Sequence, residues 1–544
     1  MSFTRFAATA AAIALVQLSV AVTPTVASSR IDAVATALRG GPDIGSVEVS
    51  TAVHHDVSAA LRDLPDQATN DRPRREHPLL IPNAQTGGTS TDGALQTTTG
   101  PKVATTAGLS FAGVGNGDYG FAPNAAPPDT NGAVGATQYV QWVNESFAVF
   151  NKATGALVKG PTAGNTLWTG FGGGCETNND GDPIAQYDKA ANRWVLTQFS
   201  VSTTPYLQCV AVSTTSDATG TYNRYSFNYG TVQFPDYPKL GVWPDAYYVT
   251  YNIFNNGATF AGAKACAWDR AAMIAGAATA TQECFQMSTA VASLLPSDLD
   301  GATAPPAGAQ NILLNFGTNS LNAFKFHVDF ATPANASLTG PTVIPVAAFS
   351  RACNGGSCVP QPGTRQKLDS LADRLMYRLA YRNRAGAESL VVNHSVNATG
   401  GRNGVAGIRW YQLDAAAIRA GTSAVTQQGT FAPDTTFRWM GSIAMDKVGD
   451  IAVGYSASSS GVFPSIRMTG RVPGDTAGTL QTENQLLTGG GSQIGGLSRW
   501  GDYSAMTVDP VDDCTFFYTT EYLKSTGSFN WSTQIVSFKF PGCF

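Results

Sequence analysis

Short hydrophobic runs separated by polar turns recur along most of the chain. The clearest example joins residues 184–187 to residues 194–197 through a turn that contains Asp188 and Asn192. Runs rich in β-branched and aromatic residues, on either side of a turn rich in Asp, Asn, Gly or Pro, are typical of antiparallel hairpins. The same pattern predicts four more hairpins, over residues 240–250, 379–392, 443–453 and 505–518.

A second series of hydrophobic segments indicates the number of repeats. Seven such segments recur at intervals of roughly sixty residues, a spacing that indicates an internal repeat; they cover residues 147–150, 210–213, 265–268, 323–326, 408–411, 465–468 and 535–538. Four-stranded sheets arranged radially have a repeat of this kind, and each must share its faces with its neighbours in a closed ring. We therefore predict an all-β fold, a β-propeller of seven four-stranded blades in one domain over residues 105–544. A stacked array of β-sandwiches is the alternative.

The first 104 residues have a different pattern. A positive charge at Arg5, an apolar run over residues 6–22 and small residues at 25–27 predict a secretory signal peptide over residues 1–27. A membrane anchor is the weaker alternative, because Gln17 and Ser19 interrupt the run. Residues 28–104, with a helix-like stretch at 31–64 followed by a polar stretch, are interpreted as a propeptide or a partly disordered, flexible extension.

Composition narrows the choice of compartment and partner. Only 13% of the 544 residues are charged and the formal net charge is −4, so we predict no nucleic-acid partner. With no other long apolar run, we expect a mature protein without a membrane span, secreted or periplasmic, and monomeric. Eight cysteines suit an oxidising compartment. They allow 105 pairings, of which proximity in sequence favours Cys175–Cys209, Cys266–Cys284, Cys353–Cys358 and Cys514–Cys543. Metal binding by these thiols is the rival interpretation, which the absence of a CxxC pair disfavours.

Polar residues stand where the innermost strand of most predicted blades begins. They are acidic in the first three blades and basic in the last three: Asp129, Asp182 and Asp236, then Arg374, Arg438 and Arg499, with Trp439 and Trp500 after two of the arginines. Since innermost strands line the central channel, we predict one mouth with an acidic half and a basic, aromatic half. Guanidinium groups bind carboxylates in a bidentate manner and a nearby carboxyl group can move protons, so this mouth suits a carboxylated ligand. Alternatively, the charges pair across the ring as structural salt bridges and the tryptophans pack between blades.

The ends of the second strands supply further candidates. Amide side chains recur there and favour hydrogen bonds that cap turns, whereas Glu145, His394 and Glu521 stand beside them. We take His394, Glu521 and Tyr503 as candidate catalytic residues, with a buried structural role as the alternative for the histidine. Residues 178–182 carry closely spaced oxygen ligands that could hold a structural calcium ion, although they lack the full EF-hand pattern. No other metal and no cofactor is predicted.

One turn resembles a motif of a known family. Residues 216–222, from Ser216 through Asp217 to Tyr222, resemble a degenerate Asp-box of secreted bacterial propellers of the broad sialidase-like kind. The three arginines are similar to the arginine triad with which sialidases hold a carboxylate. The resemblance implies Tyr503 as a nucleophile paired with Glu521, and one of the three aspartates as acid/base. The chain departs from the family in its seven repeats rather than six, its single weak Asp-box and its lack of an Arg-Ile-Pro motif, so the resemblance supports the fold more than the reaction.

Two functions follow. The first is an extracellular enzyme that cleaves a carboxylate-bearing glycan or surface polysaccharide, either by hydrolysis or as a lyase in which Tyr503 or His394 abstracts the α-proton. The second is a non-catalytic propeller that binds a glycan or a protein. Convergence of the three arginines near Tyr503 or Glu521, in an open cavity, would favour the enzyme.

Overall fold

The computed structural model describes residues 42–66, 74–75, 79, 81, 92–98, 100–401 and 404–544. The chain divides into a unit of residues 1–41, which lies outside the described residues together with the predicted signal peptide, and a unit from Pro42 to Phe544. None of its described helices is both long enough and apolar enough to cross a membrane.

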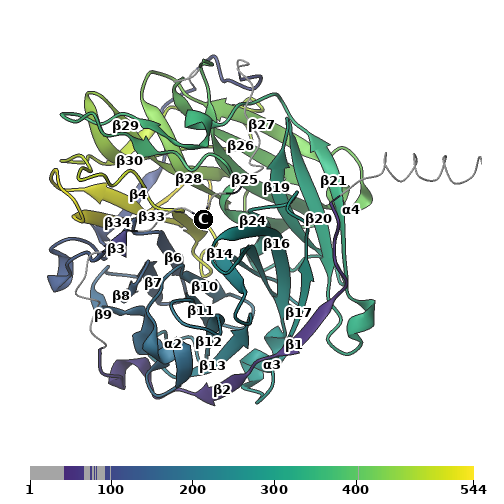
Figure 1. Ribbon diagram of the computed structural model, residues 1–544. Coiled ribbons are helices and arrows are strands. Elements are labelled where there is room, and N and C mark those ends of the chain that lie inside the picture. Colours follow the sequence, from purple (N-terminus) through teal and green to yellow (C-terminus); the bar gives the residue numbers. More distant parts are fainter. Residues whose placement is uncertain are drawn as a thin grey trace, which may run out of the picture. The chain divides into compact units, whose positions relative to one another are not determined.

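The described residues form seven groups of four antiparallel strands, here named blades 1 to 7 in chain order (Figure 1). Blade 1 contains β6 (Thr130–Val134), β7 (Gln138–Val143), β8 (Ser146–Asn151) and β9 (Leu157–Ala163). Blade 2 contains β10 (Ile184–Asp188), β11 (Arg193–Ser200), β12 (Leu207–Ser213) and β13 (Tyr222–Asn228). Blade 3 contains β14 (Gln233–Val242), β15 (Tyr247–Asn255), β16 (Thr259–Trp268) and β17 (Thr281–Gln286). Blade 4 contains β18 (Leu295–Asp300), β19 (Asn311–Gly317), β20 (Ser320–His327) and β21 (Ser337–Pro345).

The remaining blades follow the same plan. Blade 5 contains β24 (Met376–Arg384), β25 (Ala387–Asn397), β26 (Ala406–Asp414) and β27 (Val425–Phe431), and it joins blade 4 through the parallel pair β18–β24. Blade 6 contains β28 (Phe437–Met445), β29 (Ile451–Ser459), β30 (Val462–Arg471) and β31 (Asn484–Leu487). Blade 7 contains β32 (Ala505–Val508), β33 (Phe516–Leu523) and β34 (Trp531–Lys539), and its fourth strand is β4 (Thr106–Ala112) from the other end of the chain.

Short elements complete the unit. The additional strands are β1 (Glu48–Thr51), β2 (His54–Val57), β3 (Arg74–Arg75), β5 (Ala125–Ala126), β22 (Ser357–Val359) and β23 (Leu368–Asp369). The α-helices are α2 (Gly173–Thr177), α3 (Arg270–Ala275) and α4 (Ala415–Ala420). Single 3₁₀ turns occur at η1 (Leu61–Asp63), η2 (Asp118–Gly120), η3 (Gly164–Trp168), η4 (Pro333–Asn335) and η5 (Ala352–Gly355).

The first strand of each blade lies innermost, and these strands close a ring. In order, β6, β10, β14, β18, β24, β28 and β32 each contact the next, and β32 contacts β6. The core lies between neighbouring blades, as where Phe227 of blade 2 stacks on Trp268 of blade 3 with ring centroids 5.5 Å apart. Each blade therefore buries its faces against its neighbours. The prediction of an all-β propeller is confirmed. The five hairpins fall at β10–β11, β14–β15, β24–β25, β28–β29 and β32–β33, and the seven counting segments all lie in third strands.

The segment before blade 1 corrects one expectation. Where the helix-like stretch 31–64 is described, it forms the strands β1 and β2 and the single turn η1. β1 extends blade 3 by pairing with β17, and β2 extends blade 2 by pairing with β13. The sequence Glu48-Val-Ser-Thr51 has good strand propensity, and two open sheet edges offer it partners, so pairing overrides the local helical pattern.

Residues 42–66, 92–98 and 100–112, here called the belt, run along the outer edges of several blades. Besides β1, β2 and β4, the belt bridges blade 5 at Leu95 and Thr430, and blade 6 at Lys102 and Thr482. Its Asp92 is fully buried and lies 2.5 Å from the Arg409 guanidinium of blade 5. The described part of the predicted flexible extension is therefore bound to the sheets.

All four predicted disulfides are confirmed. Cys175–Cys209 links α2 to β12, and Cys266–Cys284 joins the paired strands β16 and β17. Cys353–Cys358 closes a small loop, and Cys514–Cys543 ties the end of the chain to blade 7. Four disulfides fit a protein of an oxidising compartment.

Candidate active site at the channel mouth

The inner strands begin with irregular backbone. Asp129 and Asp182 have φ angles of 43° and 45°, and Tyr237 and Met440 have φ angles of 56° and 53°. Left-handed backbone at residues other than glycine costs energy and concentrates at functional sites. The pairing of β14 and β28 with their neighbours also shifts register at these starts, between Asp236 and Lys239 and between Trp439 and Ser442. Such bulges redirect side chains, and they often lie beside active sites.

Two of the predicted aspartates join neighbouring blades. Asp129 Oδ1 accepts a hydrogen bond of 2.6 Å from the backbone N–H of Asp502, which joins blade 1 to the start of blade 7. Asp182 Oδ2 accepts one of 3.0 Å from the backbone N–H of Tyr237, which joins blade 2 to blade 3. Both carboxylates thus hold the start of one inner strand against another.

A lysine that the sequence analysis did not select lies at the centre of the mouth. Lys239 is fully buried, and its Nζ lies 3.4 Å from the ring centroid of Tyr237 and 4.2 Å from that of Tyr503. Nζ also donates a hydrogen bond of 2.8 Å to the carbonyl oxygen of Pro238. Burial lowers the pKa of Lys239 to about 7, although the negative charges of Asp182 and other nearby carboxylates oppose this shift. The amine is held by two aromatic faces, which favour its cationic form.

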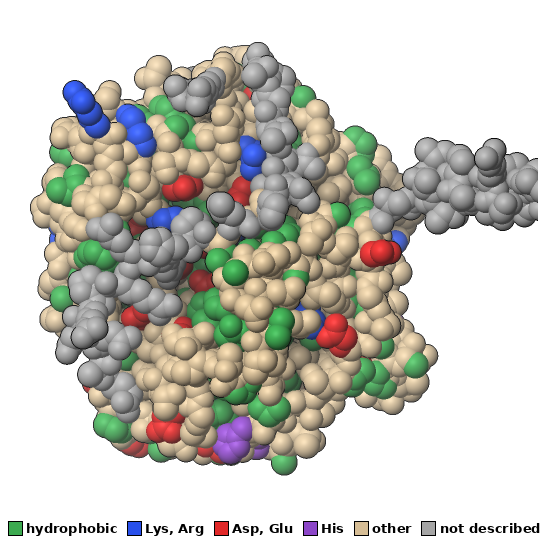
Figure 2. Space-filling model, in the orientation of Figure 1, with side chains coloured by type: hydrophobic (Ala, Val, Ile, Leu, Met, Phe, Trp, Pro, Cys, Tyr) green, Lys and Arg blue, Asp and Glu red, His purple; other side chains and the backbone are tan. Residues whose placement is uncertain are grey.

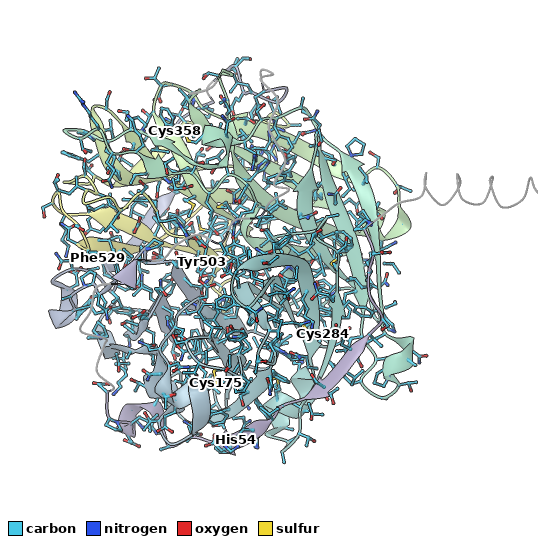
Figure 3. All side chains as sticks on the ribbon, viewed as in Figure 1. His54, Cys175, Cys284, Cys358, Tyr503 and Phe529 are labelled. Carbon is cyan, nitrogen blue, oxygen red and sulfur yellow. A yellow bond between two sulfur atoms is a disulfide. The ribbon has the colours of Figure 1, made fainter. Side chains whose placement is uncertain are left out.

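Asp236 stands beside this lysine and is partly exposed. Burial, together with the charge of Asp182, raises the pKa of Asp236 to about 7, although Arg374, Lys239 and Arg499 oppose the shift. An acid and an amine whose pKa values both lie near 7, close together on one inner strand, are a feature of acid–base sites. Figure 2 shows acidic side chains (red) in the hollow near the middle of this face. Figure 3 shows Tyr503 near the point where the inner strands converge. We call Asp182, Asp236, Tyr237, Lys239, Arg374 and Tyr503 the mouth cluster.

Two of the three predicted arginines belong to the mouth. The Arg374 guanidinium lies 4.3 Å from the ring centroid of Tyr237, and it binds Asp373 through Nε at 2.8 Å and Nη2 at 3.1 Å. Arg499 pairs with Asp502. Both arginines act on the charge of Asp236, but the close ion-pair partner of each is a neighbour in sequence rather than an aspartate across the ring.

Arg438 corrects the prediction of a three-arginine mouth. Its fully buried guanidinium binds Glu483 at 2.7 and 2.9 Å and Asp434 at 3.0 and 3.2 Å. Arg467 also pairs with Glu483, at 2.6 Å. These partners belong to blade 6 and its flanking loops, so Arg438 takes part in an ion-pair network of its own blade. A register shift lies just after Arg438 in β28, between Trp439 and Ser442, and such a bulge changes which residues face the channel.

The two tryptophans pack inside the protein. Trp439 and Trp500 are 0% and 2% exposed, and their ring centroids are 5.9 Å apart. Trp500 Nε1 donates a hydrogen bond of 3.0 Å to Ser456 Oγ, and both rings share a hydrophobic cluster with Leu371 and Met376. Trp439 and Trp500 therefore pack inside the protein, as the alternative interpretation of the sequence expected. They present no aromatic surface to a ligand.

The remaining candidates are also buried. His394 lies between Phe316 and Phe349, with Nε2 3.0 Å from Tyr411 Oη, and burial and the charge of Arg409 lower its pKa. Burial raises the pKa of Glu521, which is 2% exposed, well above its ordinary value. In both side chains burial favours the neutral form, and both are enclosed by the protein.

Tyr503 does lie in the mouth cluster. Its Oη donates a hydrogen bond of 3.1 Å to the carbonyl oxygen of Pro183, and its ring lies edge-to-face against Tyr237 and Tyr377.

A second buried cation lies further along the inner strands. Arg378, 1% exposed, binds Asp298 at 2.5 Å and Asp300 at 2.9 Å, and Nη1 donates to the carbonyl oxygen of Met506. These partners come from the inner strands of blades 4 and 7, so the guanidinium spans between inner strands. Lys239 and Arg378 could have been suspected from the sequence, because each charge stands directly before an apolar residue of a predicted hairpin strand, Leu240 and Leu379.

The candidate calcium loop uses its oxygens internally. Asp180 Oδ2 accepts hydrogen bonds from the backbone N–H groups of Val201 and Ser202, at 2.6 and 2.7 Å. Asn178 Nδ2 donates to Ser200 Oγ and Thr203 Oγ1. Across the described residues, no group of three or more His, Cys, Asp or Glu side chains could hold a metal ion.

The Asp-box-like turn lies between β12 and β13. Asp217 Oδ1 accepts hydrogen bonds of 2.9 Å from the backbone N–H of Thr219 and from Gln138 Nε2 of blade 1. The turn thus fastens blade 2 to blade 1, and the sialidase-like assignment stays a prediction.

The fold and its inner-strand site define the protein as a β-propeller. No protein-family model and no curated protein sequence matches the chain. Among solved structures, the chain is similar to the WD40 domain of coronin from Toxoplasma gondii, with a TM-score of 0.37 and 10% identity over 82% of this chain and 89% of that one. It is also similar to an ulvan lyase, a polysaccharide lyase, with a TM-score of 0.28 and 10% identity over 82% of this chain and 84% of that one. For an endo-arabinase from Bacteroides thetaiotaomicron the TM-score is 0.25, with 8% identity over 65% and 92%. Similarity at this level does not indicate a reaction, which must be argued from the site itself.

Proposed function

We propose that the protein is an exported, carbohydrate-active β-propeller whose reaction takes place at the mouth cluster, with Asp236 as the acid–base residue. The observation that carries the proposal is the position of Asp236. It is a partly exposed carboxyl group beside the buried Lys239, flanked by Asp182 and Arg374. A substrate that enters the mouth meets a proton donor and acceptor held close to half-protonation.

The chemistry of glycan cleavage fits this arrangement. Hydrolysis needs an acid that protonates the leaving oxygen, and elimination needs a base and an acid; both work best with pKa values near the operating pH. The pKa of Asp236, at about 7, meets that requirement at neutral pH. A uronate or sialate carboxylate could approach Arg374, since the pair with Asp373 engages Nε and Nη2 and a guanidinium has five N–H donors.

Tyr503 is the second residue proposed to act in the mouth. Lys239 lies over its ring. In a lyase reaction Tyr503 would act as the phenolate and accept the α-proton, while Asp236 protonates the leaving oxygen. Glu521, which the sialidase resemblance pairs with Tyr503, is enclosed by the protein, and burial raises its pKa; we therefore assign it no part in the reaction.

A non-catalytic glycan- or protein-binding propeller is the second candidate. The pairing of Arg438 with Glu483 and of Arg499 with Asp502 favours it, because these arginines are already neutralised. The buried contacts of Arg378 between inner strands point the same way, since they stabilise the ring rather than reach a ligand.

One experiment separates the candidates. The wild type, Asp236→Asn and the control Asp245→Asn are incubated with sialylated and uronate-containing glycans, and the products are identified by mass spectrometry. Asp245 is an exposed acid in the turn at the other end of the same β14–β15 hairpin. We expect products from the wild type and the control, with an inflection of rate near pH 7, and loss of products in Asp236→Asn.

Two outcomes would count against the enzyme. Products that persist in Asp236→Asn would remove Asp236 from the chemistry. No products from any glycan, with glycan binding that Asp236→Asn abolishes, would support the binding propeller instead.

A further inference from the structure

A pocket lies at the end of the inner strands opposite the mouth cluster. It has a volume of about 260 Å³ and is lined by turns of blades 2, 3, 4 and 7. Val242, Pro244, Leu299 and Pro510 supply much of its apolar wall. We call it the turn-side pocket. A concave, mostly apolar pocket with a few polar groups is the usual form of a small-molecule site.

Two cationic side chains, Lys189 and Arg270, lie in the wall of the turn-side pocket. Lys189 Nζ lies 2.5 Å from Asp300 Oδ1, and Arg270 binds Asp188 through Nε at 2.6 Å and Nη2 at 3.0 Å. The side chains of the two cations are 16% and 15% exposed, whereas those of Asp300 and Asp188 are 1% and 0% exposed. The positive groups therefore face the opening, and their counter-charges lie behind them.

Both cations retain donors for a ligand. Lys189 donates to Asp300 and to the carbonyl oxygen of Leu299, which uses two of its three N–H donors. Arg270 donates twice to Asp188 and once to the carbonyl oxygen of Pro244, which uses three of five. An anion at the rim would thus gain charge-assisted hydrogen bonds without breaking the existing pairs.

We propose that the turn-side pocket binds a compact apolar carboxylate, with its ring between Val242, Leu299 and Pro510 and its carboxylate against Lys189 and Arg270. The volume suits a ligand about the size of a bicyclic aromatic acid. The site is separate from the mouth cluster, because the buried Arg378 and its partners Asp298 and Asp300 lie on the inner strands between the two ends. The proposal therefore stands or falls independently of the reaction at the mouth.

The test uses indole-3-acetate as the probe and its uncharged amide, indole-3-acetamide, as the charge control, with binding followed by calorimetry. Ala302→Phe fills the pocket from an exposed loop position without touching either ion pair. Ala307→Phe is the matched control, since it makes the same change at an exposed position of the same loop outside the lining.

We expect indole-3-acetate to bind the wild type and Ala307→Phe equally, and Ala302→Phe at least about tenfold more weakly. The amide should bind the wild type at least about fivefold more weakly than the acid, because it cannot form charge-assisted bonds. Melting curves confirm that both variants fold. No binding of the acid to the wild type, equal binding to Ala302→Phe, or equal binding of acid and amide would each overturn the proposal.

Discussion

Removal of the Asp92 carboxylate tests how the belt is held. Asp92 and Arg409 are both fully buried, and Asp92 also accepts hydrogen bonds from Thr430 Oγ1 at 3.0 Å and from the N–H of Ala94 at 2.8 Å. Asp92→Ala would leave the Arg409 charge buried without its partner. Breaking one side of a buried ion pair costs about 3–5 kcal/mol. Asp92→Asn keeps the acceptor oxygen and loses only the charge, so its cost should fall nearer about 1–3 kcal/mol.

The loss should be local, because few other buried contacts hold residues 92–98. The informative assay is amide hydrogen exchange of Gly93 and Gln96, whose N–H groups donate to Ala348 and Thr430. A loss of about 3–5 kcal/mol speeds exchange through local opening by about two to three and a half powers of ten. Exchange within β25 and β26 should stay slow.

Asp63→Ala is the control within the belt, since Asp63 is an exposed residue of η1. Its effect should stay within about 0.5 kcal/mol. Unchanged exchange of Gly93 and Gln96 in Asp92→Ala would refute the reasoning, because the belt would then be held by contacts other than this ion pair.

Three further predictions concern stability. The pKa of Asp236 is raised to about 7 in the folded chain, so the folded state keeps a proton that the unfolded state releases above about pH 4. The stability of the wild type should therefore fall as the pH rises from about 4 to about 7. Asp236→Asn should have a higher melting temperature than the wild type at pH 8 but not at pH 4. The same difference in melting temperature at both pH values would contradict this prediction. The Cys514–Cys543 disulfide spans 29 residues and the Cys353–Cys358 disulfide spans 5. In the chain-entropy model, replacing both cysteines of the first disulfide by Ser should therefore cost about 1.5 kcal/mol more unfolding free energy than the same change in the second. Urea unfolding measures the difference, and the reverse order would contradict the model. Trp439→Ala should cost about 3–5 kcal/mol in urea unfolding through the cavity it leaves, with glycan binding or turnover at the mouth preserved; a loss of that activity in folded protein would return Trp439 to the site.

The strands and disulfides were predictable because their signals are local. A run such as residues 443–453, with Asp446 and Gly449 in its turn, specifies a hairpin whatever surrounds it. Cysteines that are close in sequence form disulfides because the strands or loops that carry them are neighbours. Cys266 and Cys284, for example, lie opposite each other on the paired strands β16 and β17.

The belt was not predictable in this way. The strands β1 and β2 form only because the edges of blades 3 and 2 lie open to them, more than a hundred residues away in sequence. Local propensity is a weak guide where such distant partners decide the outcome.

The site was predictable in kind but not in detail. Of the residues selected from the sequence, Asp236, Arg374 and Tyr503 lie in the mouth cluster, and their part in a reaction stays a prediction. The register shift between Asp236 and Lys239 turned the lysine inward, and the shift after Trp439 accompanies the burial of Arg438 in its own blade. A single extra residue reverses which side chains face the channel, and a sequence does not reveal where a bulge falls. Side-chain packing likewise determines that Arg374 forms its ion pair with Asp373.

The closure of blade 7 by β4 sets the order in which the chain can finish folding. Ser110 of β4 and Gln534 of β34 are in contact although they are 424 residues apart. During synthesis, β4 emerges before every blade and has no partner until the last one is complete. Proteins dominated by such distant contacts fold slowly, and unpaired strand edges invite aggregation in the meantime. A growing or truncated chain that lacks β34 therefore leaves the edges of β33 and β4 without their partner at once, and such edges can pair with other chains.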